Sequence, residues 1–226
     1  RHLSEHSLTL PGAPTGRMHF MSEPSQEQER YALSFTSGSL LSREAAVAAP
    51  LYLEARDWNT VRLRLQNDNL LQARTASSAA RLSREVTQRL AVFRDEELEF
   101  LQDASLTERS QLMWVAACRR YGFIGDFAEE VVREKFLLMN PTLRHEDFES
   151  FVRSKSLWHP ELSEVKPSTL QKLKTTLFRM LVEAGLLADG QIVETVLSLR
   201  LQDLLGGRTV DDVRFFPARN EGAVQE

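Results

Sequence analysis

The sequence has few of the residues that build disulfides, paired-cysteine metal centres or sheets rich in tight turns. Its 226 residues include one cysteine, Cys118, which excludes an intramolecular disulfide. Ten glycines and eight prolines are few for a protein built from many hairpins. No run of about 18 uncharged apolar residues occurs, so we expect no membrane-spanning helix. The first twenty residues also lack the unbroken apolar core of a secretory signal, and together these features favour a cytoplasmic protein.

Motifs of the common enzyme classes are missing as well. The sequence contains no phosphate-binding G-x-x-x-x-G-K-[ST] loop, no G-x-G-x-x-G motif and no G-x-S-x-G motif. Its five histidines never stand at the spacing of metal ligands. Cys118 adjoins Arg119 and Arg120, a setting that lowers the pKa of a thiol, but we expect a small buried residue of a helix there. We therefore predict no catalytic residues, no cofactor and no metal.

What the sequence has in quantity is helix-forming residues at helical spacing. Hydrophobic residues make up 42% of the chain, enough for a core, and leucine, alanine, glutamate, arginine and glutamine dominate. Apolar residues three and four positions apart predict helices over 40–53, 58–65, 75–93, 95–101, 107–121, 127–140, 146–155, 168–185 and 196–205. We expect Thr107 and Asp126 to cap two of them, and either Ser168 to cap a third or Pro167 to stand at its start. Short apolar runs around Asp189-Gly190 predict either a hairpin or a loop.

These patterns predict an all-α fold, a compact globule of many helices with two helix-turn-helix-like units. A small wing hairpin near Gly190 could complete the second unit. The expected divisions are an extension, native or not, over residues 1–30 and a first helix-turn-helix-like unit over 31–94. An acidic helical middle over 95–157 and a helix-turn-helix or winged-helix-like unit with a tail over 158–226 follow.

The net charge is only -4, but basic and acidic residues are concentrated in different segments of the sequence. Residues 56–94 contain eight arginines against three acidic residues, and residues 153–179 contain six basic against two acidic residues. Residues 95–152 contain thirteen acidic against six basic residues. The two basic segments therefore coincide with the two helix-turn-helix-like units, and the net charge excludes a uniformly basic nucleic-acid coat protein.

Basic and hydroxyl residues gather where a helix of each unit begins. Free N–H groups at such a start suit a phosphate, and the early residues of a recognition helix reach the major groove. In the first unit the candidate DNA contacts are Arg62, Arg64, Arg74, Ser77, Ser78, Arg81 and Arg84. In the second unit they are Lys166, Ser168, Thr169, Lys172 and Lys174. The alternative is that both clusters are solvated helix faces paired with the acidic middle.

Several stretches resemble one protein family. They are Ser34–Leu41 (SFTSGSLL), Trp58, Asn69–Thr75 (NLLQART), Arg119–Ala128 (RRYGFIGDFA) and Phe178–Leu187 (FRMLVEAGLL). These stretches are similar to the BrxA proteins of bacterial BREX phage-exclusion systems, and the resemblance covers residues 31–217. It implies a small, helical, cytosolic protein with two helix-turn-helix-like parts that is thought to bind DNA. It also implies action beside a site-specific DNA methyltransferase and large ATPases, and it transfers no catalytic residues.

The sequence leaves two functions open. The first is a non-catalytic accessory protein of a phage-defence system, a monomer that binds double-stranded DNA through the two basic helix starts and works with other BREX components. The second is a protein–protein adaptor whose acidic segment Asp95–Glu149 docks a basic partner subunit. An enzyme is a distant third, because no motif brings a nucleophile, base or metal together.

Overall fold

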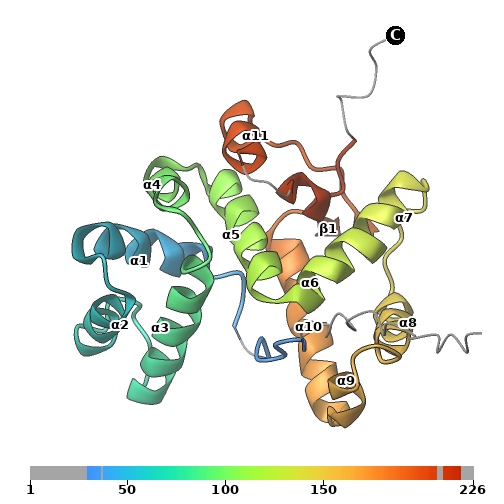
Figure 1. Ribbon diagram of the computed structural model, residues 1–226, viewed down its shortest axis with the longest axis horizontal. Coiled ribbons are helices and arrows are strands. Elements are labelled where there is room, and N and C mark those ends of the chain that lie inside the picture. The colour runs from blue at the N-terminus through green and yellow to red at the C-terminus, as the bar shows by residue number, and fades with distance from the viewer. Residues whose placement is uncertain (1–29, 37, 208–210, 220–226) are drawn as a thin grey trace, which may run out of the picture.

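The structure is a computed structural model that describes residues 30–36, 38–207 and 211–219. It confirms the expected mostly α-helical fold: helices dominate and the only sheet among the described residues has two short strands (Figure 1). No helix in these ranges is long and apolar enough to cross a membrane. The first half contains α1 (Ser42–Ala55), α2 (Trp58–Asn67), α3 (Ala76–Leu90), α4 (Asp95–Asp103) and α5 (Leu106–Arg120).

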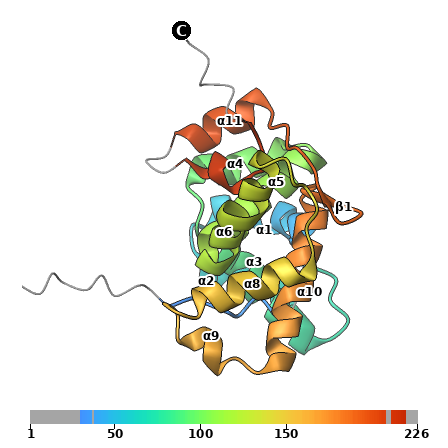
Figure 2. The same ribbon diagram turned by 90° about the vertical axis from the view of Figure 1, so that its right-hand side faces the viewer.

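The second half begins with α6 (Gly122–Phe127), which runs through a π-helical turn (Ala128–Arg133) into α7 (Glu134–Leu137). There follow α8 (His145–Lys155), α9 (Glu161–Glu164) and α10 (Pro167–Glu183), strands β1 (Leu187–Ala188) and β2 (Gln191–Ile192), α11 (Leu199–Gly206) and a final 3-10 turn (Asp212–Phe215). Helices α1 to α3 lie on one side of α5 and α6, and α8 to α10 lie on the other (Figures 1 and 2).

Helix α5 is the buried axis of this arrangement. Every side chain from Gln111 to Cys118 is buried, and a helix that is buried all round needs neighbours on every side. Trp114 at its centre donates its indole N–H to the carbonyl of Phe215 at 2.9 Å, which ties the end of the chain to the axis. One continuous hydrophobic core includes residues from Phe35 to Phe216, and it draws on all three predicted divisions, 31–94, 95–157 and 158–226.

The starts of two helices differ from those predicted, and the start of a third follows one of two predicted alternatives. Ser105, not Thr107, begins α5, because Ser105 and Glu108 exchange two reciprocal hydrogen bonds in a capping box. Asp126 lies inside α6, where its carboxylate accepts hydrogen bonds from other segments. Helix α10 begins at Pro167, one of the two starts that the sequence allowed, since proline suits the first helical position.

The Asp189-Gly190 sequence makes the hairpin that the pattern allowed. β1 and β2 pair antiparallel, with Leu187 opposite Ile192, and both turn residues have positive φ (50° and 74°). The segment before α8 runs beside β2, because the N–H of Ile192 donates to the carbonyl of Pro141 at 2.7 Å. A two-stranded hairpin flanked by this segment therefore follows α10.

A buried ion cluster joins three segments at the end of α5. The Arg119 guanidinium contacts Glu97 of α4 at 2.8 Å and Asp212 of the final turn at 2.5 Å. Glu97 and Asp212 are buried, and 9% of the Arg119 side chain is exposed. Burial works to lower the pKa of Arg119, but the hydrogen bonds to Glu97 and Asp212 outweigh it and raise the pKa.

Arg119→Met tests how far the fold depends on this cluster. The variant leaves two buried carboxylates without their cation, so we expect the free energy of unfolding to fall by about 3–5 kcal/mol. Arg43→Met is the control, because Arg43 is exposed on α1 and should change stability by no more than about 0.5 kcal/mol. Denaturant unfolding measures both, and equal small losses would contradict the role assigned to Arg119.

Candidate nucleic-acid interface

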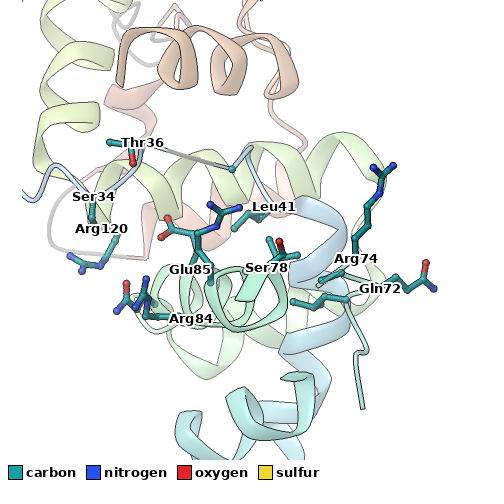
Figure 3. A pocket seen from close by; sticks show the side chains of 15 residues that line it. Ser34, Thr36, Leu41, Gln72, Arg74, Ser78, Arg84, Glu85 and Arg120 are labelled. Atoms are coloured by element: carbon teal, nitrogen blue, oxygen red, sulfur yellow. The ribbon is translucent and has the colours of Figure 1, made fainter. Parts of the chain in front are cut away.

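A pocket of about 670 Å³ opens beside α3. One wall is the face of α3 that carries Ser78, Arg81 and Gln88, and another is the segment before α1 (Figure 3). The turn between α2 and α3 closes one end, and Arg120 from the end of α5 contributes at the other. Four arginines thus line one hollow: Arg74, Arg81, Arg84 and Arg120.

The spacing of residues on α3 explains why this face looks outward. Ala79, Val86 and Leu90 are buried and turn one side of the helix to the core. Ser78, Arg81 and Glu85 follow one another at intervals of three and four and occupy a neighbouring side. Thr75 caps the helix by accepting a hydrogen bond from the N–H of Ser78 at 3.2 Å.

The turn before α3 is held by Asn69. Its side-chain amide accepts from the N–H of Ala73 at 2.9 Å and donates to the carbonyl of Ala73 at 3.1 Å. Asn69 and Gln72 have positive φ, of 45° and 53°, and the resulting bend brings Gln72 and Arg74 to the end of the pocket. The connection from α2 to α3 spans residues 68–75, which is longer than the three or four residues of a simple helix-turn-helix.

Glu85 is the acidic residue that lines the pocket, and its charge is already neutralised. Its carboxylate accepts from Arg89 Nε at 3.0 Å and from the Tyr121 hydroxyl at 2.6 Å. Burial raises the pKa of Tyr121 most, and the hydrogen bond to Glu85 raises it further. The phenol therefore stays protonated and donates the hydrogen bond. The arginines of the pocket therefore face a carboxylate that is already paired with Arg89, rather than a free anion.

Of the predicted contacts in the first unit, the structure brings Arg74, Ser78, Arg81 and Arg84 together. Ser77 is exposed on the first turn of α3 but does not line the pocket. The two arginines of α2 lie elsewhere: Arg62 donates to the Asn59 side chain at 3.1 Å, and Arg64 pairs with Glu54 at 3.0 Å.

In the second unit, Lys166, Ser168 and Lys172 are exposed at the start of α10, and Thr169 is half-buried. Lys174 differs, because it is 8% exposed and its ammonium lies 2.9 Å from Glu149 of α8. Its side chain points towards α8, so its charge is paired with Glu149 inside the protein. We therefore leave Lys174 out of the interface.

Sequence reasoning missed Arg120, Gln72 and Gln88 as lining residues. Arg119 and Arg120 are neighbours in sequence, but their side chains point in different directions from the helix. Arg119 lies in the ion cluster with Glu97 and Asp212, and Arg120 lines the pocket. No local signal distinguishes the two. Gln72 could have been noticed, because it stands between Asn69 and Arg74 in a predicted turn.

The carboxylates of the acidic middle and the four arginines of the pocket are in opposite situations. Most carboxylates of the middle pair with cations within the chain: Asp95, Glu97, Asp103, Glu108, Asp126, Glu129, Glu130, Asp147 and Glu149. Among the described residues, the four arginines of the pocket form no ion pair. The basic surface therefore remains available to an external anion.

Comparison with known proteins agrees with this fold. The BrxA family model matches residues 29–208. The chain belongs to the BrxA family. It is 30% identical to the "BREX protein BrxA" of Escherichia coli O9:H4 (strain HS) over 148 residues, which cover 66% of this chain and 70% of the relative. It is 29% identical to the "BREX protein BrxA" of Paramagnetospirillum magneticum (strain ATCC 700264 / AMB-1) over 171 residues, 76% of this chain and 83% of the relative.

A solved structure shares the fold of this BrxA-family chain. It is described as the crystal structure of an uncharacterized protein from Magnetospirillum magneticum. The superposition has a TM-score of 0.70 at 25% sequence identity, and it covers 79% of this chain and 93% of the other.

The pairing of Lys174 with Glu149 predicts a pH dependence of stability. The hydrogen bond from Lys174 lowers the pKa of Glu149 below the usual 4.5. A carboxyl with a lowered pKa stabilises the fold above its unfolded pKa, and the contribution is lost as the pH falls through the lowered value. We expect Lys174→Met to lower the unfolding free energy at pH 7 and to weaken its fall between about pH 5 and pH 3. Lys172→Met, which removes an exposed lysine, should leave the pH profile of unfolding unchanged.

Proposed function

We propose that this BrxA-family chain is a non-catalytic accessory component of a BREX phage-defence system that binds double-stranded DNA in the cytoplasm. The name of its two relatives supports the assignment to BREX, and other BREX components are then its expected protein partners. The observation that carries the DNA-binding part is the set of four arginines around the pocket beside α3, which have no acidic partner within the part of the chain that the structure describes.

The physical argument rests on phosphate contacts. Arginine presents donors in a fork that fits phosphate oxygens, and unpaired guanidinium groups lose little on meeting DNA because no internal ion pair is broken. The exposed start of α10, with Lys166, Ser168 and Lys172, adds a second set of donors. A small hairpin follows α10 in the chain, as a wing follows the recognition helix of a winged-helix protein, and it would add a contact to the DNA backbone.

The adaptor hypothesis gains less support. An acidic docking surface needs carboxylates that are free to meet a basic partner, and most carboxylates of the middle segment are paired within the chain. An enzyme gains least. Burial raises the pKa of Cys118 well above its ordinary value, which makes a poor nucleophile. No three histidine, cysteine, aspartate or glutamate side chains in the described ranges gather as metal ligands.

Salt dependence is the first test of the proposal. Fluorescence anisotropy of a labelled duplex should show saturable binding at about 50 mM salt that weakens steeply by about 200 mM, because each neutralised phosphate releases counterions. No binding at the lower salt concentration would contradict DNA binding and favour the adaptor hypothesis instead.

Charge removal maps the surface. We expect Arg81→Gln and Lys172→Gln together to weaken duplex binding and to lower the salt slope by about 0.9 for each phosphate that the variant no longer neutralises. Arg144→Gln is the matched control, since Arg144 is exposed on the acidic middle segment and lies outside both basic regions. If the double variant binds like the control, the proposed surface is wrong even where DNA binding itself holds.

A further inference from the structure

The pocket beside α3 is deeper and chemically more varied than a duplex backbone requires. Its volume of about 670 Å³ falls within the usual range of about 300–1,000 Å³ for sites that enclose a small molecule. A helical backbone needs donors on an open surface, and it would leave such a hollow unfilled. We propose that the pocket takes an unpaired nucleotide of a DNA strand, an inference that rests on the proposed function.

The ends of the pocket suit phosphate groups. Arg84 and Arg120 lie at one end, and Arg74 lies at the other (Figure 3). Glu85 lies between them, and its repulsion of an anion is reduced because its carboxylate pairs with Arg89 and accepts a hydrogen bond from Tyr121. A strand that enters along α3 therefore meets a guanidinium group on each side of an internally paired carboxylate.

The space between the ends suits a base. Three leucines contribute apolar surface to the lining: Leu41, Leu71 and Leu82. The amides of Gln72 and Gln88 each offer donors and an acceptor, which is what the edge of a base requires. Arginine planes also stack on bases that have left a helix. In an intact duplex these base faces and edges are covered, whereas an unpaired nucleotide presents them without the cost of unstacking.

The same chemistry, a nucleoside phosphate, could come from a strand or from a free nucleotide. Anisotropy assays distinguish the sources with three probes, a blunt duplex of about 20 base pairs, the same duplex with a single-stranded overhang of about five nucleotides, and free dAMP as competitor. We expect the overhang to raise affinity roughly tenfold over the blunt duplex, because a base stacked on a protein adds binding free energy. Free dAMP at high concentration should remove this gain and leave blunt-duplex binding in place.

Ala73→Phe fills the pocket without changing its charge, since Ala73 belongs to the lining. It should abolish the preference for the overhang and preserve blunt-duplex binding. Ala80→Phe is the matched control, an exposed position of α3 outside the lining, and it should keep the preference. Gln88→Leu is a second, milder variant that should reduce the preference, and it keeps the test valid if Ala73→Phe does not fold.

The outcomes separate the inference from the function on which it rests. Equal affinity of the wild type for blunt and overhanging duplexes overturns the inference and leaves duplex binding standing. Saturable dAMP binding without a preference for the overhang also overturns it, and assigns the pocket to a free nucleotide. Absence of binding to either duplex at low salt overturns the proposed function together with the inference.

Discussion

The arrangement of the N-terminal half depends on one buried guanidinium, that of Arg89. It is inaccessible to solvent, it donates to the carbonyls of Ser39 and Leu40 at 2.7 and 3.2 Å, and it pairs with Glu85 one helical turn earlier. Tyr121 donates to the same carboxylate, so a single ion pair fixes α3 to the segment before α1 and to the end of α5. A buried charge without its partner costs several kcal/mol, about 3–5, so the elements around it have little freedom to rearrange. The same ion pair removes a negative charge from the pocket, and the basic character of that site is thus a consequence of how the fold is held.

Internal neutralisation also explains how a chain with a net charge of -4 keeps a basic face. Carboxylates of the middle segment meet cations supplied by other helices, as in Arg119 with Glu97 and Lys155 with Asp126. Close pairs of this kind have short-range fields, because opposite charges a few ångströms apart cancel at distance and salt screens what remains. The arginines around the pocket have no such partner among the described residues, so their field extends to an approaching polyanion.

Residue patterns account for most of the helices but for only part of the site. Helices α1 to α5, α8 and α10 follow from apolar spacing and from the residues that end them, and the Asp189-Gly190 pair marked the hairpin. Lys172 and Lys174 look equivalent in sequence, yet a rotation of about 200° around α10 exposes the first and buries the second against Glu149. Arg120 joins the pocket only through the packing of α5 beside α3. Contacts between helices that are distant in sequence leave no local pattern, which is why the pocket could not be predicted although its arginines on α3 could.

Residues 38–40 make hydrogen bonds to elements of both basic regions. The carbonyl of Gly38 accepts from Arg179 of α10 at 3.3 Å, and the N–H of Leu40 donates to Glu183 of α10 at 2.6 Å. On the other side, Arg89 of α3 holds the carbonyl of Leu40. Two sites on a flexible linker adapt to many spacings, whereas two sites on one rigid body reinforce each other only when the DNA fits their fixed separation. If both regions bind one DNA molecule, as the proposed function requires, they reinforce each other only where the shape of that DNA matches this separation.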